Sequence, residues 1–272
     1  MQIVRFQHRI LSALVLLALS TLCPAQQESQ LTAEQQREFL LNAKVIGQKQ
    51  TSKGITSPYR LTLTDGKITH DALFQSVNER RPYKQFDSGA SEINFVDSYL
   101  YNLAAYELAK LLGMDDMLPV TVLRQYSGKT GSLCWWLPVR MDEGERMNKK
   151  INAPDPDAWN KAMYKQRVFA QLIYDTDRNV QNVLIGQDWK LYIIDFTRAF
   201  RLFHRIKNPK DLVRCDRALL DRLRALDSRV LADRTKDYLN KMELEGVMKR
   251  RDLIVAHFEK LIAEKGENEV LY

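Results

Sequence analysis

The apolar residues of the first half of the chain recur with helical and strand periods. In residues 33–46 apolar side chains recur at helical spacing after a capping-box pattern, which predicts a helix. Residues 47–57 are polar and are predicted to form a linker. Residues 59–64 alternate with period two and continue after Asp65-Gly66, a hairpin turn signal, into a second extended stretch over 67–77. A β-hairpin is therefore expected after the first helix.

A helix and a second hairpin follow. Residues 78–94 are polar and irregular, whereas residues 95–112 carry leucines on one helical face and end at Gly113, which suits a left-handed C-cap. Residues 120–126 and 133–139 are extended and flank a glycine-containing turn. The first half is thus expected to run hairpin, helix, hairpin.

The second half is mostly helical in pattern. The charged, proline-containing residues 141–157 predict a domain boundary, and residues 158–174 have the apolar spacing of a helix. Two short strands are expected at 183–185 and 191–194, before a stretch from 209 to Gly266 that again reads as helical. The predicted fold class is α+β, with a small β-rich N-terminal lobe around one main helix and a larger, mostly helical C-terminal lobe.

The first 25 residues have the pattern of a secretory signal peptide. Arg5 and Arg9 give a basic start, residues 10–22 are apolar, and Cys23-Pro-Ala25 precedes a polar run. An uncleaved anchor is the weaker alternative, because the stretch is shorter than the ~20 residues that span a bilayer. A lipoprotein site at Cys23 is weaker still, since the bulky Leu22 precedes it. We expect an exported protein, periplasmic or secreted, with no stable membrane span after cleavage.

Composition and charge narrow the class of protein and its partners only broadly. The chain has 272 residues, 45% of them hydrophobic, which fits a folded protein with a sizeable core and excludes a disordered or collagen-like chain. The formal charge of +7 falls to +5 without residues 1–25 and is spread out, and no interleaving of aromatic with basic residues points to a nucleic-acid partner. Export permits a disulfide between Cys134 and Cys215, but two distant cysteines do not establish one.

One stretch combines the groups that phosphoryl transfer requires. The predicted helix 158–174 leads into a polar loop that carries Asp177 and Asn182, and the second short strand ends at Asp195. A carboxylate can orient or deprotonate an attacking hydroxyl, while an Asp and an Asn hold Mg²⁺ against the phosphates. The order of these residues therefore indicates a kinase-type site.

In these residues the chain resembles the protein-kinase-like superfamily, and most of all the branch of phosphatidylinositol 3- and 4-kinases, HipA-type bacterial kinases and the secretory-pathway kinases of animals. That branch has a D-R-x-x-x-N loop and a later Asp at a strand end, matched here by Asp177, Arg178, Asn182 and Asp195. The resemblance implies that Asp177 is catalytic, that Arg178 organises the loop, and that Asn182 and Asp195 bind metal.

The resemblance also implies a two-lobe kinase-like architecture. We expect a signal peptide at 1–25, an N-terminal helix and linker at 26–57, an N-lobe at 58–140 and a C-lobe at 141–272. The implied cofactor is ATP or another nucleotide with Mg²⁺ or Mn²⁺.

The N-lobe departs from the family pattern. The family places a lysine on a strand and a glutamate on the following helix to hold the phosphates, whereas Gln75 and Asn102 stand at those positions. Such a pair can hydrogen-bond but cannot neutralise phosphate. Lys84, or else Lys67, is expected to substitute, and no GxGxxG motif is present. An ordinary polar role for Gln75 and Asn102 is the alternative.

Other interpretations of the polar loop remain open. Residues 175–181 mimic the start of an EF-hand loop, but Gly and Glu are missing from its later positions. Residues 172–177 resemble a haloacid-dehalogenase nucleophile motif, although helical spacing precedes them. Structural roles are also possible, with an ion pair between Asp177 and Arg178 and an acidic partner for Arg198.

The implied activity is phosphoryl transfer from a nucleotide to a hydroxyl group of a protein, a lipid or a small molecule. The alternative is a catalytically inactive pseudokinase that acts as a binding or scaffolding module. Loss of both N-lobe charges favours the pseudokinase, whereas retention of Asp177, Asn182 and Asp195 favours the enzyme.

Overall fold

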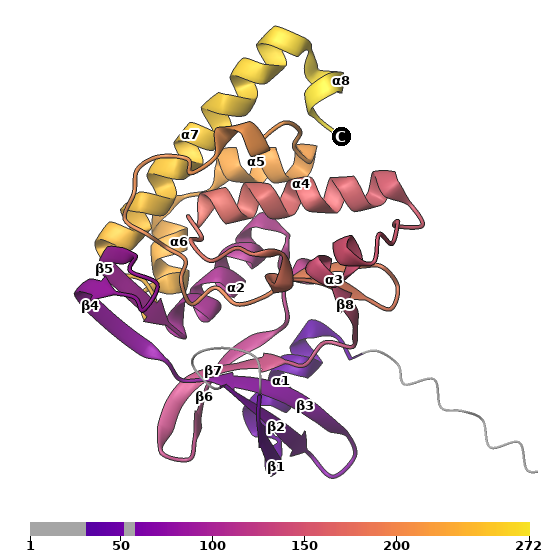
Figure 1. Ribbon diagram of the computed structural model, residues 1–272, viewed down its shortest axis with the longest axis vertical. Coiled ribbons are helices and arrows are strands. Elements are labelled where there is room, and N and C mark those ends of the chain that lie inside the picture. The colour runs from indigo at the N-terminus through magenta and orange to yellow at the C-terminus, as the bar shows by residue number, and fades with distance from the viewer. Residues whose placement is uncertain (1–30, 52–57) are drawn as a thin grey trace, which may run out of the picture. The chain divides into compact units, whose positions relative to one another are not determined.

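The computed structural model describes residues 31–51 and 58–272. Residues 32–272 form one compact unit, in which a β-rich N-terminal portion precedes a mostly helical C-terminal portion (Figure 1). This confirms the expected α+β class. The predicted signal peptide lies outside the described residues, and no described helix is long and apolar enough to cross a membrane.

A five-stranded antiparallel sheet with the order β1-β2-β3-β7-β6 forms the N-terminal portion together with α2. The predicted strands are confirmed, and their period-two alternation directs Leu61, Leu63, Ala72 and Phe74 into the buried core. The Asp65 carboxylate accepts hydrogen bonds from two backbone N–H groups and closes the expected turn. The elements described in this portion are α1 (Ala33–Asn42), β1 (Lys44–Gln50), β2 (Tyr59–Thr64), β3 (Thr69–Gln75), β4 (Asn78–Gln85), β5 (Ser91–Ser98), α2 (Leu100–Leu112), η1 (Asp115–Met117), β6 (Thr121–Tyr126) and β7 (Lys129–Trp135).

The first helix is shorter than its pattern predicts. Its capping box at Thr32 and Gln35 is confirmed, but α1 ends at Asn42, and residues 44–50 form β1 instead of helix and linker. Ile46, which extended the helical spacing, is 56% exposed on β1. Antiparallel pairing with β2 therefore overrides the local helical pattern in this segment.

The prediction of irregular structure over 78–94 is wrong. These residues form most of the antiparallel hairpin of β4 and β5, which lies beside the start of α7 (Figure 1). Their polar side chains are explained by ion pairs with the C-terminal portion, such as that between Arg80 and Glu243. Helix α2 accordingly begins at Leu100, not at Phe95, and ends at the left-handed Gly113 as predicted.

The C-terminal portion packs helices around α4 and α7. Its small sheet has the order β10-β9-β8. The predicted helix at 158–174 and the two short strands after it are confirmed. The segment 141–157, where a domain boundary was predicted, contains part of β8, all of α3 and the start of α4. The elements are β8 (Val139–Asp142), α3 (Glu143–Asn148), α4 (Pro156–Leu172), η2 (Val180–Asn182), β9 (Val183–Gly186), β10 (Leu191–Ile193), η3 (Pro209–Asp211), α5 (Arg217–Ala225), α6 (Ser228–Thr235), α7 (Lys241–Lys265) and α8 (Glu267–Val270).

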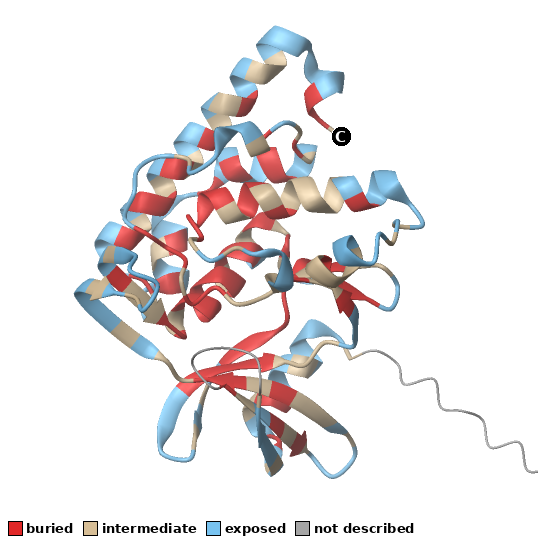
Figure 2. Cartoon of the chain, in the orientation of Figure 1, coloured by how far each residue is buried: buried red, intermediate tan, exposed pale blue. Residues whose placement is uncertain are grey.

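Buried residues run through α2, α4 and α7 and into the five-stranded sheet (Figure 2). Cys134 and Cys215 belong to this interior and are free thiols, so they do not form the disulfide that export would permit. Burial raises the pKa of Cys134 to about 11 and that of Cys215 to about 12, which keeps both thiols protonated and unreactive at neutral pH.

Candidate active site

Helix α4 delivers the polar loop that carries Asp177. The helix ends at Leu172, and the backbone turns at Tyr174, which has a left-handed φ of 48°. Buried Asp175 then accepts a hydrogen bond of 3.0 Å from the backbone N–H of Asp177. Because the segment before Asp177 is helical, the haloacid-dehalogenase interpretation, which requires a strand, is wrong.

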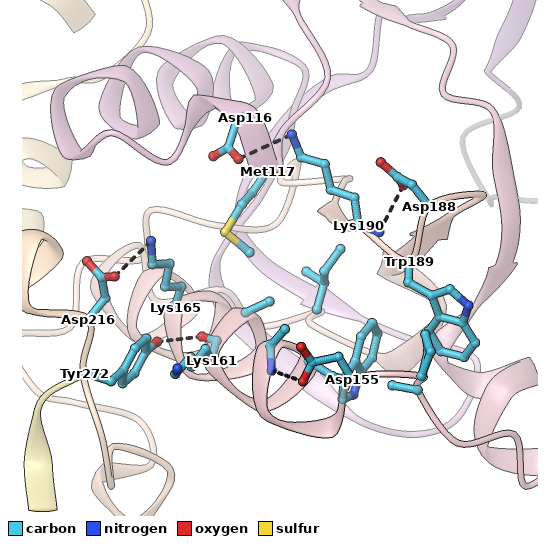
Figure 3. A pocket seen from close by; sticks show the side chains of 16 residues that line it. Asp116, Met117, Asp155, Lys161, Lys165, Asp188, Trp189, Lys190, Asp216 and Tyr272 are labelled. Atoms are coloured by element: carbon cyan, nitrogen blue, oxygen red, sulfur yellow. Dashed lines mark hydrogen bonds and ion pairs between the residues drawn. The ribbon is translucent and has the colours of Figure 1, made fainter.

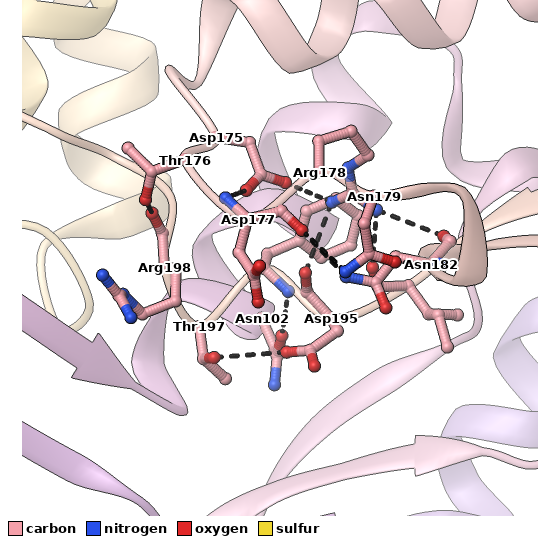
Figure 4. Close-up of polar contacts among 12 residues, drawn as sticks. Asn102, Asp175, Thr176, Asp177, Arg178, Asn179, Asn182, Asp195, Thr197 and Arg198 are labelled. Atoms are coloured by element: carbon pink, nitrogen blue, oxygen red, sulfur yellow. Dashed lines mark hydrogen bonds and ion pairs between the residues drawn. The ribbon is translucent and has the colours of Figure 1, made fainter. Parts of the chain in front are cut away.

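Arg178 ties this loop to the strand end that carries Asp195. Its guanidinium donates to the carbonyl oxygen of Ile194 at 2.7 Å and to that of Asn182 at 3.2 Å (Figure 4). The same group forms an ion pair with buried Asp175. The alternative interpretation, in which Asp177 and Arg178 form an ion pair, is therefore wrong, since the acid that pairs with Arg178 is Asp175.

This arrangement leaves the carboxylate of Asp177 exposed at the surface of the loop. Among the described residues it takes part in no hydrogen bond or ion pair with a side chain. An exposed carboxylate without an intramolecular partner can accept a hydrogen bond from a hydroxyl group of another molecule. The Asp175 carboxylate, by contrast, is engaged by Arg178 and by the backbone N–H of Asp177. It is therefore not available as the first cation ligand of an EF-hand loop, which argues against that interpretation.

Asn182 and Asp195 face the same region from adjacent elements (Figure 4). The Asn182 side-chain amide donates to the Asp177 carbonyl at 3.1 Å, which leaves its side-chain oxygen for another ligand. Asp195 follows β10 with a left-handed φ of 57°. Its Oδ1 accepts a hydrogen bond from the Thr197 hydroxyl at 3.2 Å. Burial raises the pKa of Asp195, while the Thr197 hydroxyl and the charge of Arg178 oppose this shift.

Gln75 and Asn102 form a direct hydrogen bond beside this region. The Asn102 amide donates to Gln75 Oε1 at 2.8 Å and to the Ser132 hydroxyl at 3.1 Å. Asn102 Oδ1 accepts from the backbone N–H of Phe196 at 2.9 Å. A buried pair without net charge thus joins β3, α2 and the residue that follows Asp195, and both polar groups of the Asn102 side chain are hydrogen-bonded.

The two lysines expected to replace the missing charge lie on different elements. Lys84 lies on β4, forms an ion pair of 3.0 Å with Glu79 and stands 3.9 Å from the centre of the Phe95 ring. Lys67 is exposed in the turn between β2 and β3. Arg198 pairs with Glu92 on β5, as its acid-paired interpretation predicts.

Two residues near Asp195 were not recognised in the sequence. The Thr197 side chain hydrogen-bonds to Asp195, and it also lies within hydrogen-bonding reach of Asp97 on β5. Asp97 is two residues after buried Phe95, so strand periodicity places both on one face. That signal was missed because residues 95–112 were read as one helix.

The structure also contains a cavity of about 540 Å³ away from these residues (Figure 3). Its walls come from η1, α4, the turn between β9 and β10, and the C-terminal Tyr272. Trp159 and Trp189 line it with their rings edge to face, 6.2 Å apart. Asp177, Asn182 and Asp195 do not contribute to this cavity, so it is not part of the candidate active site.

Comparison with known proteins identifies the fold. The chain matches no protein-family model and no curated protein sequence. Hydra Fam20, solved with a sugar, aligns with a TM-score of 0.60 at 16% identity over 90% of this chain and 93% of its own. The Helicobacter pylori proinflammatory kinase CtkA aligns with a TM-score of 0.50 at 11% identity over 83% and 98%. The chain therefore has an atypical protein-kinase-like fold with two lobes, as expected.

The donor set around Asp195 fits a hard divalent cation. Among the described residues, no three His, Cys, Asp or Glu side chains are arranged to hold a metal ion. The site instead offers the amide oxygen of Asn182 and the Asp195 carboxylate, and Mg²⁺ commonly binds through one or two carboxylates and substrate phosphates. Asp97 Oδ1 is buried nearby without a hydrogen-bond partner, which leaves an oxygen atom for a cation.

Proposed function

We propose that this kinase-like protein binds a nucleotide together with a divalent cation and transfers a phosphoryl group to a hydroxyl acceptor. The observation that carries the proposal is the bridge made by Arg178, which hydrogen-bonds to the carbonyl groups of Asn182 and Ile194. It fixes the loop of Asp177 and Asn182 against the strand end of Asp195. Catalysis of phosphoryl transfer depends mainly on such positioning.

In this proposal Asp177 orients the acceptor. Its exposed carboxylate takes the proton of the attacking hydroxyl as the new oxygen–phosphorus bond forms and the bond to the leaving diphosphate breaks. Asn182 and Asp195 would hold Mg²⁺ or Mn²⁺, which when bound neutralises phosphate charge. Arg178 acts through the loop and touches neither substrate.

In the N-lobe, the nucleotide phosphates would lie near Gln75 and Asn102, where the kinase resemblance implies a lysine and a glutamate. Gln75 and Asn102 can supply amide dipoles but no positive charge. Lys84 is the lysine we assign to the phosphates, which requires it to leave Glu79 when the nucleotide binds. An exchange of partners of this kind is inexpensive for a pair that is still partly exposed to water.

A specific observation favours the second candidate, a pseudokinase that binds without turnover. The Gln75–Asn102 pair is buried and hydrogen-bonded to itself, to Ser132 and to the backbone of Phe196, so these positions are held together without a charged clamp. The carboxylates of Asp177 and Asp195 favour the enzyme, because a scaffold has no need of an exposed base beside an acid whose pKa is raised by burial of its carboxyl group.

We place the protein in the branch of phosphatidylinositol 3-/4-kinase-like, HipA-like and secretory kinases, on its D-R-x-x-x-N loop. We further propose that it is exported after cleavage behind Ala25, to the periplasm or the medium, on the basic and apolar pattern of residues 1–25. The acceptor is a protein, lipid or small-molecule hydroxyl.

Thermal denaturation with ATP and Mg²⁺ or Mn²⁺ tests the proposal. A ligand that binds only the folded state raises the melting temperature as its concentration exceeds Kd. We expect a rise that needs both nucleotide and metal, followed by transfer of the labelled γ-phosphoryl group to an acceptor. A rise without transfer to any acceptor would support the pseudokinase, and no rise with any nucleotide or metal would exclude the enzyme.

A further inference from the structure

The end of β5 is joined to the segment that carries Asp195. The backbone N–H of Ser98 donates to the Thr197 carbonyl oxygen at 2.9 Å. The Thr197 hydroxyl lies within hydrogen-bonding reach of both the Asp97 and Asp195 carboxylates and donates to Asp195 at 3.2 Å. Two acidic side chains from different lobes therefore flank a single hydroxyl group.

One oxygen of Asp97 is left without a partner. Asp97 Oδ1 is buried and has no hydrogen-bond donor among the described residues. Leaving a buried carboxylate oxygen unsatisfied costs at least about 1–3 kcal/mol, which folded proteins avoid unless another ligand satisfies the group. The oxygen therefore indicates a ligand that accepts electron pairs, such as a cation.

The protein's own cations near Asp97 are engaged elsewhere. Lys84 and Arg198 are the positive charges that act on Asp97. The Lys84 amine forms its ion pair with Glu79, and one terminal nitrogen of the Arg198 guanidinium forms its ion pair with Glu92. Arg198 Nε is buried without a hydrogen-bond partner among the described residues. Glu79 adds a negative charge of its own to the surroundings of Asp97. Among the described residues, Asp97 therefore forms no ion pair of its own.

We infer that Asp97 is a further ligand of the divalent cation held by Asn182 and Asp195, an inference that rests on the proposed function. A hard cation takes six or more oxygen ligands, and a carboxylate from the N-lobe would add one on the side facing β5. Asp97 also supplies negative charge on the side of the site where Gln75 and Asn102 are neutral. The cation would then join the two lobes through Asp97 and Asp195.

Titration calorimetry with Mn²⁺ alone, without nucleotide, tests this assignment in the full mature chain. We expect Asp97→Asn to weaken Mn²⁺ binding by more than about tenfold, at least the loss seen when groups that support metal ligands are removed. Asp87→Asn is the matched control, because Asp87 is an exposed acid on the same hairpin. It should bind Mn²⁺ as the wild type does.

The metal-free melting temperature separates ligation from a structural role. Asp97→Asn removes an unsatisfied buried charge, so it should melt no lower than the wild type in EDTA. Wild-type Mn²⁺ affinity in Asp97→Asn, with binding lost in Asp195→Asn, would overturn the role of Asp97 and leave the proposed function standing. Absence of Mn²⁺ binding by the wild type would overturn the metal site itself and this inference with it.

Discussion

Asn102 on α2 donates a 2.8 Å hydrogen bond to Gln75 on β3, in the place where the kinase resemblance implies a lysine and a glutamate. The neutral pair forms a contact between the strand and the helix but carries no charge. It also extends to the site, because the Phe196 N–H donates to Asn102 Oδ1 directly after Asp195. The geometry of the N-lobe is thus preserved while its electrostatics are changed.

Introducing a lysine and a glutamate together at positions 75 and 102 should cost less stability than the two single changes imply, and should raise the affinity for phosphate. Gln75→Lys and Asn102→Glu each bury one unpaired charge, and each should lower the free energy of unfolding by about 3 kcal/mol. The double variant pairs the two charges and should lose much less than the sum. It should also bind ATP about tenfold more tightly, since a charge-assisted hydrogen bond to phosphate is worth about 1.5–3 kcal/mol. Urea unfolding and ATP titration check this, and strictly additive losses in the double variant would refute it.

Arg178 should be a large contributor to stability as well as to loop geometry. Its removal in Arg178→Ala leaves buried Asp175 unpaired, which should cost about 3 kcal/mol of unfolding free energy. Adding Asp175→Asn to that variant should restore part of the loss, because the uncompensated charge is gone. Arg229→Ala, at an exposed position of α6, is the control and should change stability by less than about 0.5 kcal/mol in urea unfolding.

The buried carboxylate of Asp195 predicts a pH-dependent stability of the metal-free protein. Burial raises its pKa above the ordinary 3.8, so between 3.8 and the raised value the folded state holds a proton that the unfolded state has lost. Stability should therefore fall as pH rises through this window, and the penalty should persist above it. Asp195→Asn should melt higher than the wild type at neutral pH in EDTA, and saturating Mn²⁺ should stabilise only the wild type. A lower melting temperature of the variant in EDTA would contradict this assignment.

Export makes a prediction for the N-terminus. Protein recovered from the periplasm or medium should begin at Gln26, because the pattern of residues 1–25 places cleavage after Ala25. N-terminal sequencing or intact mass measurement checks this. Exported protein that still starts at Met1 would show that the segment is not cleaved. A lipid-modified N-terminus at Cys23 would instead support the lipoprotein alternative.

Local patterns predicted the fold wherever local interactions dominate. The hairpin at Asp65-Gly66 and the C-cap at Gly113 were correct, since turn chemistry fixes both. The strands at 44–50 and 78–98 were missed, because their polar side chains gain stability from pairing and from ion pairs to distant residues such as Glu243. Sequence periodicity does not report partners that lie far away along the chain.

The same distinction applies to the candidate active site. The order of Asp177, Asn182 and Asp195 was readable because the three lie within one loop and hairpin. The ion pair between Arg178 and Asp175 was not predicted, and the structural alternative named Asp177 as the partner, because it takes the turn at Tyr174 to bring Asp175 to the guanidinium. Asp97 was missed because it enters from the other lobe.

Calorimetric titration of ATP into the mature wild-type protein, in Mn²⁺ and in EDTA, shows whether the protein binds a nucleotide through a divalent cation. We expect saturable binding in Mn²⁺, little or none in EDTA, and loss of the metal-dependent part in Asp195→Ala with an unchanged circular dichroism spectrum. ATP binding of equal strength in EDTA and in Mn²⁺, or metal-dependent binding that survives in Asp195→Ala, would contradict it.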